Sequence, residues 1–278
     1  MTKEDANAHL PTVVFLDVDY TLIGHSEAAC DRYWVARVAK DVEDSHELPR
    51  GTCPTPLIDA RAEMEPLLRP NLRAGLVGLQ RALPDCEFFV CSYGQKAVVE
   101  DLKVAGIERA TRVRFNRPIF SCTSDRDANV KTAAAHVKKK LVRKCFDVAA
   151  RRLSRKYPLL RDPKVVDGVF RSRFFMVDDT PDIAYDAASN ARLVVCPPYK
   201  FRPAAAAAAS AGGASLPQKA LRHPLVQDFI RELQKKPPLE ALPRDAEDDF
   251  WLRLADVAKQ SGGSVPAILK RMRTRSQQ

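Results

Sequence analysis

The stretch VVFLDVDYTL, residues 13–22, joins a short apolar run to two acids, Asp17 and Asp19. An uninterrupted run of Val, Phe and Leu predicts a buried β-strand. In an extended chain the side chains of residues i and i+2 lie on one side, so both carboxylates are expected to share one small space. Two like charges that close need a cation between them or a proton on one of them. The stretch therefore predicts a site that holds a metal ion or a proton.

The length and composition are those of a globular chain. The 278 residues can bury one full core with an appendage, or two small domains. Hydrophobic residues make up 45% and charged residues 29%, which excludes disorder of the whole chain. There is no run of 18 or more apolar residues and no presequence pattern at the N-terminus. We therefore expect a soluble protein of the cytoplasm or nucleus, with no membrane partner.

The seven cysteines contain no C-x-x-C pair, and their number is odd. Several of them, such as Cys91 and Cys196, lie inside apolar runs. This pattern favours reduced thiols in the core over a disulfide framework or a zinc site.

The net charge of +10 is concentrated in one segment. Residues 131–156 contain ten Lys or Arg and a single acid, Asp147. Such a segment attracts polyanions, which include nucleic acid, a phosphorylated partner or an acidic protein. The alternative is a long helix whose charged face is simply solvated.

Strand patterns alternate with helix patterns along the first two hundred residues. Five apolar, β-branched or aromatic runs are predicted strands: 12–16, 87–91, 113–120, 173–177 and 193–196. Helical patterns begin at Pro70 and cover 94–104. This alternation predicts an α/β fold, a Rossmann-like, doubly wound parallel sheet flanked by helices. Ligands of such sheets bind beyond the carboxyl ends of the strands, where Asp17 and Asp19 fall.

The chain divides into a main domain, a linker and a helical extension. The main domain is expected to span 1–201, with an insertion at about 22–69 that contains a helix near Tyr33. Residues 202–218, rich in Ala, Gly and Pro, predict a linker or loop. Helical patterns at 223–233, 245–257 and after Ser264 form the extension, 219–278. This extension is either a module docked on the core or a tail that binds a partner.

Polar residues follow two further predicted strands. Ser92 ends the second strand just before a helix, where a hydroxyl beside free N–H groups can bind a phosphate oxygen or cap the helix. Asp178 and Asp179 end the fourth strand. Carboxylates at two strand ends and a hydroxyl at a third predict one oxygen-lined site for a hard cation, best suited to Mg²⁺.

Three of these segments resemble motifs one, two and four of the haloacid dehalogenase superfamily of phosphohydrolases: VVFLDVDYTL, FFVCSYGQ (88–95) and FFMVDDTPD (174–182). Residues 67–107 more narrowly resemble the NLI-interacting-factor-like phosphatases, which act on the RNA polymerase II carboxy-terminal domain. In that group an Arg-Pro pair opens the helix before the second motif, and the fourth motif has the form V-D-D-S-P. The resemblance covers residues 11 to about 198 and leaves the helical extension outside.

The resemblance implies a role for each matching residue. Asp17 would be the nucleophile that forms an aspartyl phosphate. Asp19 would be the general acid and then base, needing a proton at the outset, and Thr21 would orient it. Ser92 and Tyr93 would bind phosphoryl oxygens. The Mg²⁺ ligands would be the following: Asp17, the backbone carbonyl of Asp19, Asp178 and Asp179.

The third family motif, a lysine that neutralises phosphate and nucleophile, has two candidates. Lys131 lies at the start of a helical pattern, and Lys164 lies closer in sequence to the fourth motif. We favour Lys131. The basic insertion at about 131–160, expected to be helical, and Tyr20 depart from the family pattern, and His25 and His136 are expected to be structural or exposed.

The sequence supports several hypotheses for function. The first is a Mg²⁺-dependent phosphatase, plausibly of phosphoserine or phosphothreonine in a protein substrate. The second is a catalytically weak or inactive protein of this fold that binds RNA or an acidic partner through residues 131–156. A third is a phosphatase of nucleic-acid ends or small phosphate esters.

Overall fold

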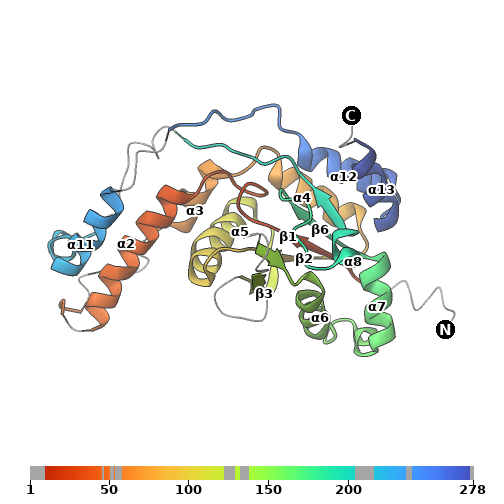
Figure 1. Cartoon of the computed structure of the whole chain (residues 1–278), viewed down its shortest axis with the longest axis horizontal. Helices are drawn as coiled ribbons and strands as arrows, with labels where there is room; N and C mark the ends of the chain where they lie inside the picture. Colours follow the sequence, from red (N-terminus) through yellow and green to blue (C-terminus); the bar gives the residue numbers. More distant parts are fainter. Residues whose placement is uncertain are drawn as a thin grey trace.

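The centre of the chain is a parallel β-sheet. The structure is a computed structural model that describes residues 10–45, 47–50, 53, 58–121, 129–131, 138–203, 216–235 and 240–275, without the side chains of 129–131, 138 and 275. The five strands are β1 (Thr12–Leu16), β2 (Cys86–Cys91), β3 (Asn116–Phe120), β6 (Phe174–Asp178) and β7 (Leu193–Val195). All neighbouring pairs are parallel, in the order β3-β2-β1-β6-β7 (Figure 1). The predicted α/β class with a parallel sheet is confirmed.

The sheet is buried on both faces. Alternate residues of β1 enter two different cores, because successive side chains of a strand point to opposite faces: Val14 and Leu16 lie in one, and Val13 and Phe15 in the other. This explains why β1 is continuously apolar rather than alternating.

Helices cover both faces of the sheet, giving three layers. One face carries α3 (Ala60–Met64), η1 (Glu65–Leu67), α4 (Leu72–Ala82), η2 (Val98–Val104), α5 (Ala105–Thr111), α12 (Phe250–Gln260) and α13 (Val265–Arg275). The other carries α6 (Val142–Leu153), η3 (Pro158–Arg161) and α7 (Pro163–Ser172). A short helix, α8 (Ala187–Asn190), precedes β7.

The strand order places the ends of β1 and β6 at the switch point of the sheet. From β1 the chain builds β2 and β3 on one side and later returns to place β6 and β7 on the other. The backbone N–H of Asp17 donates to the carbonyl of Val177 at 3.0 Å, which fixes the two strand ends side by side. Ligands of open α/β sheets bind at this point.

The expected C-terminal extension divides between two parts of the molecule. Trp251 of α12 is fully buried against α4, where a Cβ on Gly75 would lie only 2.4 Å from the Trp251 Cβ. Arg69 of the Arg-Pro pair is buried and forms an ion pair with Asp248 at 2.7 Å, just before α12. Helices α12 and α13 are therefore part of the core.

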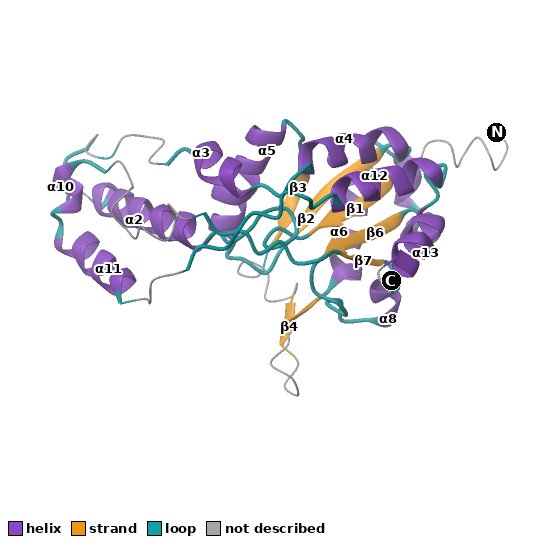
Figure 2. Cartoon of the chain, turned by 90° about the horizontal axis from the view of Figure 1, so that it is seen from above, coloured by secondary structure: helices purple, strands orange, loops and turns teal. Residues whose placement is uncertain are grey.

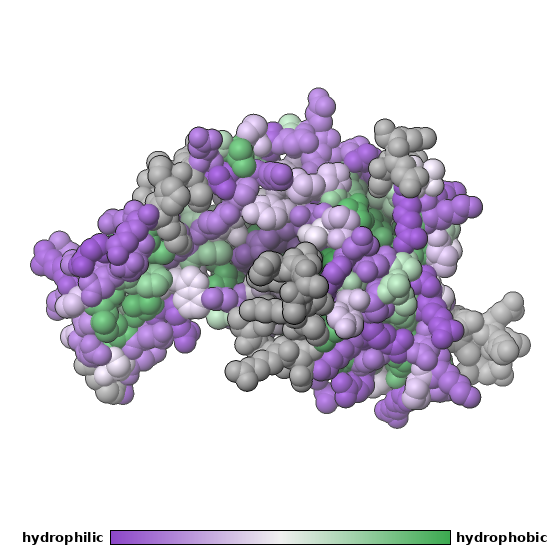
Figure 3. All heavy atoms as spheres, viewed as in Figure 1, coloured by the Kyte–Doolittle hydropathy of each residue, from purple (hydrophilic) through white to green (hydrophobic). Residues whose placement is uncertain are grey.

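The other part of the extension packs on the insertion after β1. Helix α2 (Glu27–Asp44) runs away from the sheet, and α10 (Gln218–Leu221) and α11 (Pro224–Gln234) lie beside it (Figure 2). These helices share a small apolar cluster of their own, which we call the outer lobe. Figure 3 shows apolar side chains reaching the surface over this lobe, where Leu225 is 52% exposed. The linker residues 204–215 lie outside the described residues.

The basic insertion begins as a hairpin, and not as the expected helix. Strands β4 (Asn129–Lys131) and β5 (Lys138–Lys140) pair in antiparallel register, and α6 follows. Helix α6 buries one face against the sheet through residues such as Phe146. Elsewhere the predicted strand at 113–120 starts later, at Asn116, because Arg112 in the left-handed region ends α5.

Two expectations from composition can be compared with the described residues. None of their helices is long and apolar enough to cross a membrane. Their six cysteines are free thiols, with Cys91 and Cys196 buried as predicted, and Cys122 lies outside the described residues.

Candidate functional site

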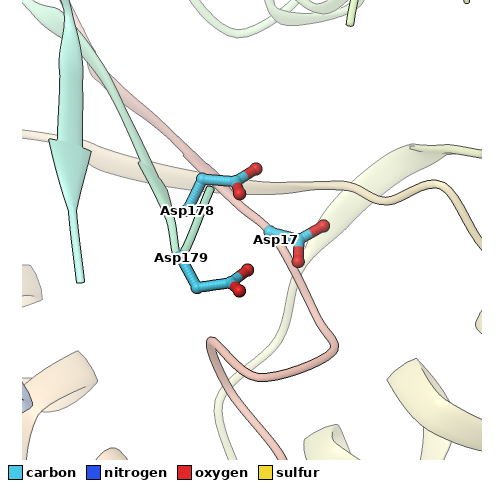
Figure 4. A group of neighbouring side chains, drawn as sticks. All are labelled: Asp17, Asp178 and Asp179. Carbon is cyan, nitrogen blue, oxygen red and sulfur yellow. The ribbon is translucent and has the colours of Figure 1, made fainter. Parts of the chain in front are cut away.

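Three carboxylates meet at the switch point of the sheet. Asp17 follows β1, Asp178 ends β6 and Asp179 comes next, and each offers an oxygen within 4.8 Å of the others. Figure 4 shows the three side chains extending to the same side, with the carboxylates of Asp178 and Asp179 directed toward Asp17. Asp17 and Asp178 are 8% and 1% exposed. Carboxylate oxygens are the donors that a hard divalent cation prefers, so these three residues could hold a metal ion.

Lys140 lies next to Asp17 and Asp178, and its side chain is almost fully buried, with 2% exposed. Its Nζ donates to Asp17 Oδ1, to Asp178 Oδ2 and to the carbonyl of Cys91, each at 2.7 Å. An ammonium group has three N–H donors, so these contacts use all of them. The lysine therefore fixes the ends of β1, β2 and β6 relative to one another.

Burial and charge shift the ionisation of these groups. Burial raises the pKa of Asp17, and Lys140 offsets only part of that effect. Burial alone would lower the pKa of Lys140, yet Asp17 and Asp178 raise it well above its ordinary value. The pKa of Asp179 is raised by burial and by Asp178. Three carboxyl groups beside one ammonium group leave an excess of acid that a divalent cation would balance.

The lysine that pairs with Asp17 is not one of the two named from the sequence. It is Lys140, whereas Lys164 is exposed at the start of α7. The backbone of Lys131 lies in β4, and its side chain is outside the described part of the chain. Residues 138–140 are all lysines, so a local sequence pattern does not show which of them will be buried. What distinguishes Lys140 is its backbone, which bonds to the carbonyl of Ile183 beyond Asp179.

Asp19 has a different cation. Its two carboxylate oxygens accept from Lys103 Nζ at 2.7 Å, and Ser26 Oγ donates to Oδ1 at 3.0 Å. Burial would lower the pKa of Lys103, but Asp19 more than offsets this and the pKa is raised. The expected proton on Asp19 stays a prediction, and the structure adds Lys103 as a cation beside this carboxyl group. Sequence analysis named neither Lys103 nor Ser26.

Asp19 is also separated from the three-carboxylate group, which contains only Asp17, Asp178 and Asp179 among the described residues. Strand β1 ends at Leu16, and Tyr20 has a positive φ of 61°. The rule that i and i+2 share a face holds only for extended backbone, and the strand ends before Asp17. The carboxylate of Asp19 therefore lies outside that group, and the backbone carbonyl of Asp19, the expected metal ligand, stays a prediction.

Thr21 was expected to orient Asp19, but its side chain makes a different contact. Its hydroxyl is fully buried and accepts from Cys196 Sγ at 3.7 Å. Its carbonyl accepts from Trp251 Nε1 at 3.4 Å, which ties the turn after Asp17 to α12. Thr21 thus stabilises the turn, and Ser26 makes the contact to Asp19.

Ser92 and Tyr93 lie beside the same edge, after β2. Ser92 is 4% exposed, and its Oγ accepts from the backbone N–H of Gly94 at 3.2 Å. The ring of Tyr93 lies over Lys140, with Nζ 5.4 Å from the ring centroid. The hydroxyl of Ser92 keeps its own proton to donate, for example to a phosphoryl oxygen.

His25 is a structural residue at the rim. Its Nδ1 lies 3.2 Å from the Tyr20 hydroxyl, 2.9 Å from Glu27 Oε1 and 2.9 Å from Arg202 Nη2. These contacts connect the turn after Asp19 to the segment that follows β7. His136 lies outside the described residues.

Much of the basic segment is engaged within the protein. Lys140 is buried, Arg143 pairs with Asp147 and Asp167, and Lys156 pairs with Glu87. The exposed basic residues of α6 and the turn after it include Arg151, Arg152 and Arg155. The docking surface expected from the sequence is therefore smaller than the charge count suggested.

The assembled site combines a buried carboxylate, a lysine that fixes it, a candidate metal position and a second, more accessible acid. This combination can support attack on an electrophile that carries negative charge, because cations surround the attacking oxygen. A scan against models of protein families, a search of curated proteins and a search of solved structures each found no match.

Proposed function

We propose that the protein is a Mg²⁺-dependent phosphatase of the haloacid dehalogenase type, which hydrolyses a phosphomonoester through an aspartyl phosphate. The observation that carries this proposal is Lys140, which joins Asp17 to Asp178 at the switch point of the sheet. The motifs around Asp17, Ser92 and Asp178 add support, since they resemble those of that superfamily.

Asp17 is the nucleophile. One of its oxygens forms a bond to phosphorus while the bond between phosphorus and the ester oxygen breaks. Lys140 holds the carboxylate in place and balances its charge, and the Ser92 hydroxyl binds a phosphoryl oxygen. Positive charge that is already in place lowers the barrier, because it need not reorganise during the reaction.

Mg²⁺ would be held by Asp17, Asp178 and Asp179, and when bound it offsets the repulsion between the nucleophile and the phosphate. Asp178 is fixed for this role, because its Oδ1 accepts from the backbone N–H of Thr180 at 2.9 Å and its Oδ2 accepts from Lys140.

Asp19 is the general acid and base. Its side chain is 31% exposed, which leaves room for it to approach a leaving group. It gives a proton to the departing alcohol and later takes one from the water that attacks the aspartyl phosphate. Lys103 then balances the carboxylate that remains after the first step.

The substrate class follows from the resemblance and is phosphoserine or phosphothreonine in a protein. Nucleic-acid ends and small phosphate esters are the alternatives, and all three can be compared in one assay of released phosphate.

Hydrolysis of p-nitrophenyl phosphate with Mg²⁺ tests the proposal. We expect Asp17→Asn to lower kcat by about 10⁴-fold or more, because the nucleophile is lost. Asp228→Asn makes the same chemical change on the exposed surface of α11 and should act as wild type. Full activity in Asp17→Asn would end the nucleophile assignment, and no activity in wild type toward any of the three substrate classes would end the proposal.

The exposed arginines on and after α6 favour a second candidate function, binding of a polyanion. We expect the triple change of Arg151, Arg152 and Arg155 to Gln to weaken binding of a single-stranded RNA and to flatten its salt dependence. The control changes three exposed arginines that already pair with acids: Arg37, Arg61 and Arg231. Equal losses in the two triple variants would show that only net charge matters.

A further inference from the structure

A surface cavity of about 410 Å³ lies between α13 and the residues that lead into β7. Figures 1 and 2 show α13 next to α8 and this end of the sheet. Seven residues line the cavity: Ala191, Arg192, Pro266, Leu269, Lys270, Arg273 and Thr274. None of them belongs to the site around Asp17.

The charge of this cavity has one sign. Arg192, Lys270 and Arg273 line it, and no carboxylate does so among the described residues. Arg273 Nη2 donates to the carbonyl of Ala191 at 2.7 Å, which holds its guanidinium beside the segment of Arg192. Burial and then Arg273 lower the pKa of Arg192, so the two like charges disfavour each other. An anion between them would relieve that repulsion.

The basic residues that line the cavity, Arg192, Lys270 and Arg273, do not all belong to the end of one helix. Basic residues near a helix C-terminus favour the helix dipole, and this accounts for Lys270, Arg271 and Arg273 as a group. Arg271, however, donates to Gln260 at 3.3 Å and does not line the cavity. Arg192 comes from a different segment of the chain. Cationic side chains from two separate segments therefore line one cavity, and the helix dipole does not account for this.

A second cavity, of about 370 Å³, adjoins the first and shares Arg273. It includes Asp182, which is close in sequence to Asp178 and Asp179, and Val195, which is the sheet partner of Asp178. Asp182 is the carboxylate that lines this neighbouring cavity, whereas Arg273 donates to the carbonyl of Ala191.

We propose that Arg192, Lys270 and Arg273 form a second, non-catalytic site that binds a phosphate group. Guanidinium groups bind phosphate through two parallel hydrogen bonds, and an ammonium group adds a point charge. The cavity is larger than a free phosphate needs, and Pro266 and Leu269 give it an apolar wall. That wall would contact the organic part of a phosphorylated molecule. The site does not depend on the function proposed for Asp17.

Calorimetric titration tests the site, with phenylphosphonate and inorganic phosphate as probes. Phenylphosphonate contains no ester bond that could be hydrolysed, and EDTA removes divalent cations from the other site. We expect Arg192→Gln, Lys270→Gln and Arg273→Gln each to weaken binding about tenfold, the size of one charge-assisted hydrogen bond. Arg271→Gln is the matched control, on the same helix with the same change in charge, and should stay within about twofold of wild type.

Several outcomes would overturn the site. These are no binding to wild type, equal binding to all variants, or an equal loss in Arg271→Gln and Arg273→Gln, which would indicate general surface charge only. Tighter binding of phenylphosphonate supports a phosphorylated organic ligand, whereas tighter binding of inorganic phosphate supports the site with free phosphate as its ligand.

Two further variants keep the result interpretable. Arg273→Gln also loses the bond to Ala191, so thermal unfolding is measured alongside, and Lys270→Gln tests the site without that bond. Ser92→Ala removes the hydroxyl that is proposed to bind phosphate beside Asp17, and it should bind both probes as wild type does. Binding that survives in Ser92→Ala separates this site from the proposed phosphatase site, and binding lost there would overturn the proposal.

Discussion

Two lysine–aspartate pairs at the carboxyl edge of the sheet differ in how tightly they are enclosed. Lys140 and its partners Asp17 and Asp178 are all nearly inaccessible, and the lysine has a third acceptor in the Cys91 carbonyl. Lys103 is also buried, but its partner Asp19 keeps 31% of its side chain exposed. The partners of Lys140 are thus all buried, whereas the Asp19 partner of Lys103 is partly accessible to solvent.

The difference matches what the two acids must do. In the proposed mechanism Asp17 must stay in one position, whereas Asp19 must approach first the leaving group and then a water molecule. Removing a partner from the enclosed pair leaves a buried charge, while a partly exposed acid can be solvated instead. The following predictions test this contrast, from the largest effect to the smallest.

The largest effect is expected for Lys140→Met. It leaves Asp17 and Asp178 without their common partner, and breaking a buried pair costs about 3–5 kcal/mol of unfolding free energy. Activity toward p-nitrophenyl phosphate should fall by at least about 10³-fold. Urea unfolding and steady-state kinetics measure the two effects.

Lys164→Met and Lys131→Met are the controls for Lys140, because both lysines were candidates for its role. Both should keep activity close to wild type. A loss in Lys131→Met that matches Lys140→Met would contradict the assignment of Lys140 alone.

Asp19→Asn should lower kcat by about 10²–10⁴-fold, and it should also lower the unfolding free energy, because Lys103 is buried and loses its charged partner. The loss should be greater for phenyl phosphate than for p-nitrophenyl phosphate, because a poorer leaving group depends more on a proton donor. Equal losses with both substrates would mean that Asp19 is not the acid.

Mg²⁺ should stabilise the folded chain by about 2.7 kcal/mol at 100 times its Kd, which thermal unfolding with and without EDTA can measure. Asp178→Asn should remove most of this gain. A gain that persists in Asp178→Asn would place the metal elsewhere.

The increase in unfolding free energy that Mg²⁺ produces should also become larger as pH rises. The pKa of Asp17 and of Asp179 is raised in the folded chain, so without metal each binds a proton more tightly when folded. That contribution to stability is present at low pH and is lost as pH rises through the raised folded pKa. Metal binding needs the ionised form, so a gain that shrinks as pH rises would contradict the proposed ligands.

The smallest effect is expected for Lys103→Met. It should lower the turnover of phenyl phosphate about tenfold and the unfolding free energy by about 1 kcal/mol or less, because Asp19 can be solvated. Lys103→Arg should recover part of the activity. A loss in Lys103→Met as large as that in Lys140→Met would remove the distinction between the two pairs.

The sequence predicted the acids of the site and missed the lysines, for a physical reason. Asp17, Ser92 and Asp178 follow apolar runs, and the carboxyl ends of parallel strands meet at one edge, so local patterns suffice. The lysines act across the chain: Lys140 is 123 residues from Asp17, and Lys103 is 84 residues from Asp19. No local pattern distinguishes a lysine that will be buried from its exposed neighbours.

In the C-terminal segment, too, local patterns predicted the elements but not the long-range contacts that they make. Its helical periodicity predicted helices near α11, α12 and α13, and all three are present. Only the packed structure divides them between the outer lobe and the core. The contact of Trp251 with Gly75 and the ion pair of Arg69 with Asp248 decide this, and each joins residues more than 170 positions apart.

What the sequence alone determined is therefore the strands of the main sheet, most of its helices and the acids at the strand ends, because strand and helix periodicity and strand-end chemistry are local properties. What the tertiary structure decided is the charge balance of the site. Lys140 pairs with Asp17, whereas Lys103 pairs with Asp19. Pairing depends on distances through space, and these are set only when the sheet, the hairpin before α6 and helix η2 pack together.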